Sequence, residues 1–174
     1  MEQSNRFIKY RWKQSAWSAL LLLFVLVGCE KFSVEEINPS KLVIPECFPN
    51  VDFPEDNAFS NTRWELGKRL FNDPILSIDS SISCGSCHKP SIAFSDDVPL
   101  SSGVFNRPGV RNSPTLANVA YNPYFLREGS VPTLEMQVLV PIQEHNEFNH
   151  NIVAIAEQLN WQPSYVSQSQ EAYG

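Results

Sequence analysis

The pentapeptide Cys84-Gly85-Ser86-Cys87-His88 constrains this chain more than any other feature of its sequence. The spacing Cys-x-x-Cys-His is typical of the attachment site of c-type haem. In such a site the two thiols form thioethers with the haem vinyl groups, and the histidine ligates the iron from one face. The sequence therefore predicts one covalently bound haem c, attached at Cys84 and Cys87 with His88 as the iron ligand.

Two other uses of a Cys-x-x-Cys pair remain to be weighed. A thioredoxin-like redox pair would lie in a βαβ context, which this sequence lacks. A four-ligand zinc site would need a second Cys/His pair at suitable spacing, and Cys29 and Cys47 do not supply it. Haem attachment is the favoured interpretation.

The amino terminus has the pattern of an export signal. Four basic residues precede an apolar run from Ala19 to Val27, which is shorter than the about 20 residues needed to span a bilayer. The run ends in Leu26-Val27-Gly28-Cys29, which resembles a bacterial lipoprotein lipobox. We expect residues 1–28 to be a signal peptide and Cys29 to carry lipid, in a lipoprotein of the bacterial cell envelope that faces the periplasm. An uncleaved anchor with an incidental cysteine is the alternative.

The charge of the expected mature chain argues against one class of partner. Residues 29–174 contain nine Lys and Arg against eighteen Asp and Glu, a formal charge of −9. No basic patch indicates nucleic-acid binding. The acidic surface could attract a basic electron donor, and it could equally serve solubility alone. Residues 29–58 contain four prolines and predict an extended tether, leaving Cys47 as a free thiol and residues 59–174 as the folded domain.

The remaining pattern predicts a mainly α domain with long loops around one haem. A capping box at Thr62 and Glu65 predicts a helix that Asn72-Asp73-Pro74 ends. The haem motif should form its own short helix before Pro90, followed by a loop over residues 91–114. Helical patterns return at residues 113–119, 133–139 and 149–159, and strand signals are scarce. Pro141 is expected to end the second of these helices.

An ordered set of short motifs surrounds the haem site. They are residues 66–74 (LGKRLFNDP), 82–88 (ISCGSCH), 93–96 (AFSD), 111–122 (RNSPTLANVAYN), 134–137 (LEMQ) and 141–142 (PI). With them, residues 55–174 resemble the di-haem cytochrome c peroxidase family, which includes the MauG-type enzymes. The part that matches is the family's amino-terminal, peroxidatic haem domain, so the resemblance implies a cytochrome c-like haem domain.

The resemblance implies a chemistry for this domain. The family reduces hydrogen peroxide to water with electrons from a small donor protein, a cytochrome or a cupredoxin. It uses a Gln and a Glu ten residues apart on the open side of the iron, and Gln137 and Glu147 stand at that spacing. Such a pair can move a proton and place a hydrogen bond near developing charge. Asn112 matches a position of a calcium site in relatives. Each residue also has a plainer interpretation. Glu147 could be one of many surface acids, Gln137 an ordinary helix residue, and Asn112 a hydrogen-bonding residue in a turn.

Several residues depart from the family pattern. No histidine lies between Lys89 and Asn112 to close the iron site, although His145 and His150 follow further on. Arg127 occupies the position of a tryptophan that passes electrons between the two haems, and Phe148 that of a methionine. The resemblance also implies a second Cys-x-x-Cys-His in a carboxy-terminal domain, which this sequence does not contain.

Because of that missing motif, we expect a fragment of a longer protein or a truncated product. The alternative function is a non-catalytic, mono-haem electron-transfer cytochrome, for which Met136 is the candidate sixth ligand, or an inactive fragment.

Overall fold

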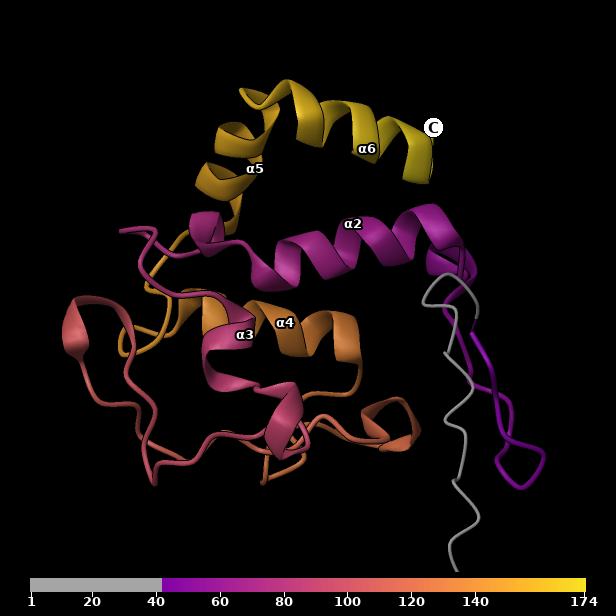
Figure 1. The fold of residues 1–174 in the computed structure, drawn as a ribbon, viewed down its shortest axis with the longest axis horizontal. Helices are drawn as coiled ribbons and strands as arrows, with labels where there is room; N and C mark the ends of the chain where they lie inside the picture. Colours follow the sequence, from indigo (N-terminus) through magenta and orange to yellow (C-terminus); the bar gives the residue numbers. More distant parts are fainter. Residues whose placement is uncertain (1–41) are drawn as a thin grey trace, which may run out of the picture. The chain divides into compact units, whose positions relative to one another are not determined.

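A computed structural model describes residues 42–174 and shows a helical domain (Figure 1). Its helices are α2 (Asn61–Asn72), α3 (Cys84–Cys87), α4 (Leu134–Gln143), α5 (Ile152–Asn160) and α6 (Pro163–Tyr173), with short 3-10 turns between them. Within these residues the only β pairing consists of three isolated bridges. The predicted mainly α, cytochrome c-like fold is confirmed. The expected signal peptide and Cys29 lie outside the described residues, as does the tether up to residue 41. No helix from residue 42 onward is sufficiently long and apolar to cross a membrane.

The N-cap of helix α2 is Ser60, two residues before the predicted cap Thr62. Ser60 has an extended backbone, and its hydroxyl accepts a hydrogen bond from the Arg63 amide at 3.2 Å, as an N-cap residue does. Thr62 lies inside the helix instead, and its hydroxyl is 3.0 Å from that of Ser60. The predicted capping box is therefore wrong in detail, because a second capping residue stood just upstream. The helix ends before Asp73, as predicted.

Helix α6 packs along α2 and forms one of two apolar clusters. Leu66 of α2 is buried with Tyr165 and Ala172 of α6. The Tyr165 hydroxyl donates to Asp73 Oδ2 at 2.6 Å, and burial followed by this carboxylate raises the pKa of Tyr165 to about 12. Arg69 lies over the Tyr165 ring at 3.6 Å.

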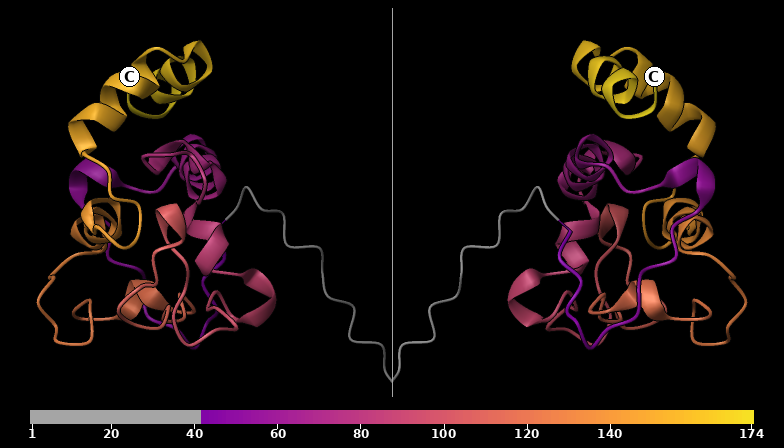
Figure 2. Two further views of the ribbon diagram at one scale, coloured as in Figure 1. Left: turned by 90° about the vertical axis from the view of Figure 1, so that its left-hand side faces the viewer. Right: turned by 90° about the vertical axis from the view of Figure 1, so that its right-hand side faces the viewer.

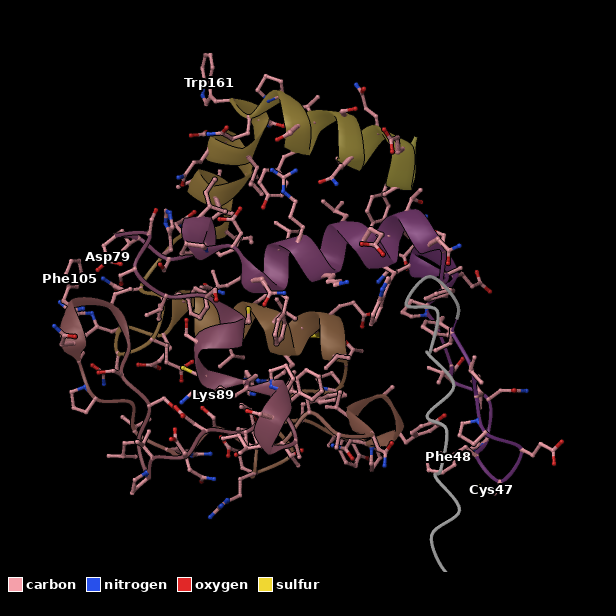
Figure 3. The ribbon with its side chains drawn as sticks, viewed as in Figure 1. Cys47, Phe48, Asp79, Lys89, Phe105 and Trp161 are labelled. Atoms are coloured by element: carbon pink, nitrogen blue, oxygen red, sulfur yellow. The ribbon has the colours of Figure 1, made fainter. Side chains whose placement is uncertain are left out.

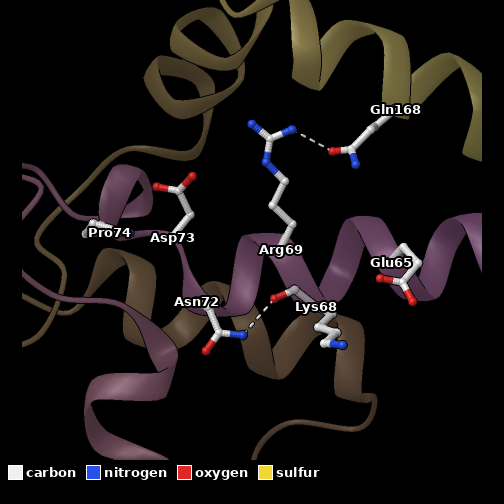
Figure 4. Close-up of a pocket in the computed structure, with 7 residues that line it drawn as sticks. All are labelled: Glu65, Lys68, Arg69, Asn72, Asp73, Pro74 and Gln168. Atoms are coloured by element: carbon white, nitrogen blue, oxygen red, sulfur yellow. Dashed lines mark hydrogen bonds between the residues drawn. The ribbon is translucent and has the colours of Figure 1, made fainter. Parts of the chain in front are cut away.

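A pocket of about 580 Å³ opens between α2 and α6 (Figure 4). The Arg69 guanidinium beside it already donates to Gln168 and Ser164. The Arg69 cation is thus engaged in joining the two helices.

The second cluster lies around α4 and α5. Leu76, Ile142, Phe148 and Ile155 are buried together, and Cys84 packs against them. Pro141 was expected to end the preceding helix, but α4 continues through it to Gln143. Proline has no amide hydrogen, so it cannot donate the helical hydrogen bond at its position. The burial of Ile142 on the next residue compensates for that loss.

The predicted helix at residues 113–119 is wrong. Only one 3-10 turn forms in this region, at Val119–Tyr121. Pro114 lies at the start of the segment, and Asn118 adopts a left-handed φ of 57° just before the turn. Neither residue suits the interior of a helix.

Long loops between α3 and α4 make up much of the rest of the domain (Figures 1 and 2). Residues 91–114 contain only short 3-10 turns, as predicted. Within residues 42–174 full burial is confined to two small side chains, those of Val104 and Ser77, while the larger side chains of both apolar clusters keep a slight exposure. Protein interiors are normally close-packed. The lack of fully buried large side chains indicates that the side chains of this domain do not by themselves form a close-packed interior.

The end of the segment predicted as a tether contacts the domain. The Phe48 ring lies 5.5 Å from that of Tyr121. Asn57 accepts a hydrogen bond from the Tyr173 hydroxyl at 3.1 Å and donates to Glu135 at 3.4 Å. Cys47, next to Phe48, is exposed (Figure 3).

Candidate haem site

The short helix α3 presents the Cys-x-x-Cys-His motif. Ser83 caps the helix, and its own amide donates to the Ser86 hydroxyl at 3.0 Å, completing a capping box. Gly85 faces α2, where an added Cβ would lie 2.8 Å from the Asn72 side-chain oxygen. The two residues between the cysteines thus have structural roles. The Ser86 hydroxyl completes the amino-terminal cap of α3, and the lack of a side chain at Gly85 allows α3 to approach α2 closely.

The two cysteines are free thiols. Burial raises the pKa of Cys84 to about 11. Burial also raises the pKa of Cys87, opposed by a hydrogen bond with Ser101 and reinforced by the charges of Asp96 and Glu147. Reactive redox cysteines need a stabilised thiolate instead. Nor does the described part of the chain hold a cluster of three or more His, Cys, Asp or Glu residues that could bind a metal ion. The environment argues against a redox pair and against zinc.

His88 caps the carboxy-terminal end of α3 and has a fixed orientation. Its Nδ1 lies 2.8 Å from the Phe94 carbonyl oxygen. A carbonyl can only accept, so Nδ1 carries the hydrogen and Nε2 keeps its lone pair. This is the arrangement of metal-binding histidines, whose second nitrogen donates to a carbonyl or carboxylate. His88 therefore suits the predicted role of iron ligand.

Gln137 projects from α4 with an unusual feature. Its Oε1 atom is buried and has no hydrogen-bond partner. Leaving such an acceptor unpaired costs about 1–3 kcal/mol. A molecule with an O–H group bound beside α4 would satisfy it. The neighbouring Met136 is half exposed, so the two side chains meet different surroundings.

Glu147 follows α4 and is half-buried. Burial is the main cause that raises its pKa, and the charge of Glu144 adds to it. Its charge in turn acts on Cys87, which brings Glu147 into the neighbourhood of the motif. Within residues 42–174, the structure gives the carboxylate no hydrogen-bond partner and no direct bond to Gln137.

The long loop fixes the backbone at Glu147. The Val104 amide donates to the Glu147 carbonyl at 2.9 Å. Arg107 donates to the His145 carbonyl at 3.0 Å. Gly103 packs so closely that an added Cβ would lie 1.9 Å from the Asn146 oxygen. The same loop carries Ser101, so it joins the motif to the segment that holds Glu147.

Other predicted residues are less engaged. His150 Nδ1 accepts the Asn151 amide at 2.8 Å, and His145 interacts with Arg107 and Asn149, so both imidazoles have local partners. Asn112 and Arg127 are exposed. Calcium at Asn112 stays a prediction.

Sequence reasoning missed three contributors to this site: the Phe94 carbonyl, the Ser101 hydroxyl and the close approach of Gly103. A glycine inside a long, function-bearing loop was a usable signal for the last of these. Nothing in the sequence marked the other two.

Taken together, these features fit a covalently attached haem. Two unactivated thiols stand at the right spacing, an imidazole is held with Nε2 free, a buried amide oxygen lacks a partner, and few side chains are fully enclosed. The fold and the site define a c-type haem domain.

Comparison with known proteins identifies the family. The profile of the family described as "Di-haem cytochrome c peroxidase" matches residues 61–174, and the chain belongs to this family, whose cofactor is c-type haem. Methylamine utilization protein MauG of Methylorubrum extorquens is 34% identical over 130 residues, 75% of this chain and 36% of that protein. Cytochrome c551 peroxidase of Pseudomonas aeruginosa is 35% identical over 114 residues, 66% of this chain and 33% of that protein.

A solved structure supports the same fold. The crystal structure of a MauG-like protein associated with microbial copper homeostasis has a TM-score of 0.69 at 28% identity, and the match covers 75% of this chain and 39% of that one. The chain spans about a third of the length of the curated relatives that it matches.

Proposed function

We propose that this chain supplies the peroxide-reducing haem domain of a di-haem peroxidase. The reaction consumes one hydrogen peroxide, two electrons and two protons, and releases two waters. A small donor protein, a cytochrome or a cupredoxin, is the proposed electron source. The observation that carries the proposal is the buried, unpartnered Oε1 of Gln137, because a bound peroxide has the O–H group that this oxygen needs.

The haem, attached through Cys84 and Cys87 and ligated by His88, supplies redox-active iron to the site. Gln137 orients the peroxide by accepting a hydrogen bond from it. Glu147 takes a proton from one peroxide oxygen and returns it to the other. Its raised pKa favours this role, because a general acid–base works best with a pKa near the working pH. Gln137 lies on α4 and Glu147 on the segment after it, and both residues are half-buried.

The test is the reaction of the haem-loaded chain with peroxide in a single turnover, followed by stopped-flow absorption. The assay follows only the first reaction of the ferric haem with peroxide, before electrons from a donor or a second haem are needed. Glu147→Gln should slow the reaction at least about a hundredfold, within the range found for general acid–base groups. Glu157→Gln, a change at an exposed acid on α5, is the control and should leave the rate unchanged. Equal rates for all three proteins would exclude a role for Glu147.

The resting spectrum distinguishes the alternative function. A high-spin ferric haem that changes on peroxide addition supports the peroxidase. A six-coordinate, low-spin spectrum of the Met–His type would contradict it, and would favour an electron-transfer cytochrome with Met136 as sixth ligand.

We also propose that the protein is a lipoprotein of the bacterial cell envelope with its haem domain facing the periplasm. The lipobox-like Leu26-Val27-Gly28-Cys29 supports this, and so does the attachment of c-type haem outside the cytoplasm. Radiolabelled palmitate should be incorporated into the full chain in cells. A Cys29→Ser variant should incorporate none, and equal labelling of the two would refute the proposal.

A further inference from the structure

The segment directly after the haem motif makes a tight and strained reversal. The Lys89 amide donates to the Ser95 carbonyl at 3.0 Å, and the Phe94 amide donates back to the Lys89 carbonyl at 2.8 Å. Between them, Ala93 and Phe94 both adopt a left-handed φ of 57°. Residues with a side chain rarely adopt this conformation, and two in succession persist only when their surroundings enforce them. The reversal places the Phe94 carbonyl on His88 Nδ1.

An ion pair closes the reversal. Lys89 Nζ lies 2.6 Å from Asp96 Oδ1 and equally 2.6 Å from Asp97 Oδ1 (Lys89 is labelled just below α3 in Figure 3). The two carboxylates differ in their surroundings, since the Asp96 side chain is 6% exposed and that of Asp97 is 70% exposed. Asp96 also accepts from the Ser101 hydroxyl at 2.7 Å. Asp96 is therefore the anchored partner, and Asp97 contributes a solvent-screened contact.

We propose that Lys89 and Asp96 are positioning residues for the haem ligand. Their ion pair holds the reversal closed, and this keeps the Phe94 carbonyl on His88 Nδ1. A hydrogen bond from Nδ1–H makes the imidazole a stronger electron donor to a bound metal. The pair thereby favours ferric over ferrous iron and lowers the reduction potential of the haem. The inference uses only the haem of the family and is independent of the proposed reaction with peroxide.

Three variants of the haem-loaded full chain test this role. Asp96→Asn and Lys89→Met each break the anchored pair, whereas Asp97→Asn removes the exposed partner and is the matched control. Two properties are measured, the iron–histidine stretching frequency by resonance Raman and the midpoint potential by redox titration. Neither depends on turnover.

We expect the iron–histidine frequency to fall in Asp96→Asn and in Lys89→Met, and to stay unchanged in Asp97→Asn. The ratio of ferrous to ferric stability should rise about threefold in Asp96→Asn, which is about 28 mV at 59 mV per tenfold for one electron. A plain charge effect would instead shift the potential in opposite directions in the Asp96 and Lys89 variants and leave the frequency unmoved. That result would overturn the proposal, as would equal effects of Asp96→Asn and Asp97→Asn. If one of the two pair variants does not mature with haem, the frequency of the other decides.

Discussion

Replacing Gly103 by alanine tests how the long loop holds the segment that carries Glu147. Gly103 has a φ of −90°, which any residue can adopt, so the substitution brings no backbone strain of its own. The cost comes instead from the lack of space for a methyl group at this position. The new Cβ would lie 1.9 Å from the Asn146 oxygen and 2.8 Å from the Glu147 Cα, and both are backbone atoms that cannot rotate away.

The expected cost follows from these contacts. Forcing a methyl group into a packed site costs about 1–3 kcal/mol. If the loop around Gly103 moves away from the segment around Glu147, the hydrogen bond from the Val104 amide to the Glu147 carbonyl also breaks. This bond lies next to the fully buried Val104 side chain. A buried group left unpaired adds about 1–3 kcal/mol. We expect Gly103→Ala to lower the free energy of unfolding by about 2–6 kcal/mol.

The assay is urea denaturation of the haem-loaded chain, followed by far-ultraviolet circular dichroism. Gly67→Ala is the control, because Gly67 lies within α2 with no atom within 4 Å of the added Cβ. Alanine there should raise the stability by about 1 kcal/mol through its higher helix propensity. A loss of less than about 1 kcal/mol in Gly103→Ala would refute the reasoning, since the loop would then not be tightly held on Glu147.

Three further predictions concern other parts of the domain. Ser60→Ala should lower the free energy of unfolding by about 1 kcal/mol through loss of the N-cap of α2, while Thr62→Ala should change it far less. A larger loss in Thr62→Ala than in Ser60→Ala, measured by urea denaturation, would contradict this and support Thr62 as the cap. Tyr165→Phe should cost about 1–2 kcal/mol in the same assay, because the Asp73 carboxylate loses its buried donor, and an unchanged midpoint would contradict this. Glu147→Gln should gain stability relative to the native chain as the pH rises through the Glu147 pKa. The folded-state pKa is raised, so the native chain loses stability over that interval, and parallel pH profiles of the two proteins would disprove it.

The chemistry of the haem site was readable in the sequence because its signature is local. Five consecutive residues define the attachment motif, and Gln137 was placed through its position in a family pattern. Glu147 was predicted from the same pattern, but the contacts that hold its backbone come from a loop more than forty residues upstream, which no local pattern encodes. The hydrogen bond between His88 Nδ1 and the Phe94 carbonyl could not be predicted either, since nothing in the sequence indicates a left-handed backbone at Ala93 or Phe94.

The errors in the helices have a common physical origin. Propensity alone predicted that Pro141 would end its helix, but the burial of Ile142 keeps the chain helical. Helix α6 has a largely polar sequence with no strong apolar periodicity, and packing through Tyr165 and Ala172 defines it. Tertiary contacts outweighed local preference at both places.

The scarcity of fully enclosed side chains bears on how such a domain remains folded. A ligand held by equilibrium binding stabilises a protein only in proportion to the logarithm of its free concentration, so dilution weakens the effect. The proposed thioether bonds at Cys84 and Cys87 would remove that dependence, because the haem would become part of the chain itself. Covalent attachment would thus make the cofactor a permanent part of the core of residues 42–174, and irregular loops could surround it without the risk of losing it on dilution.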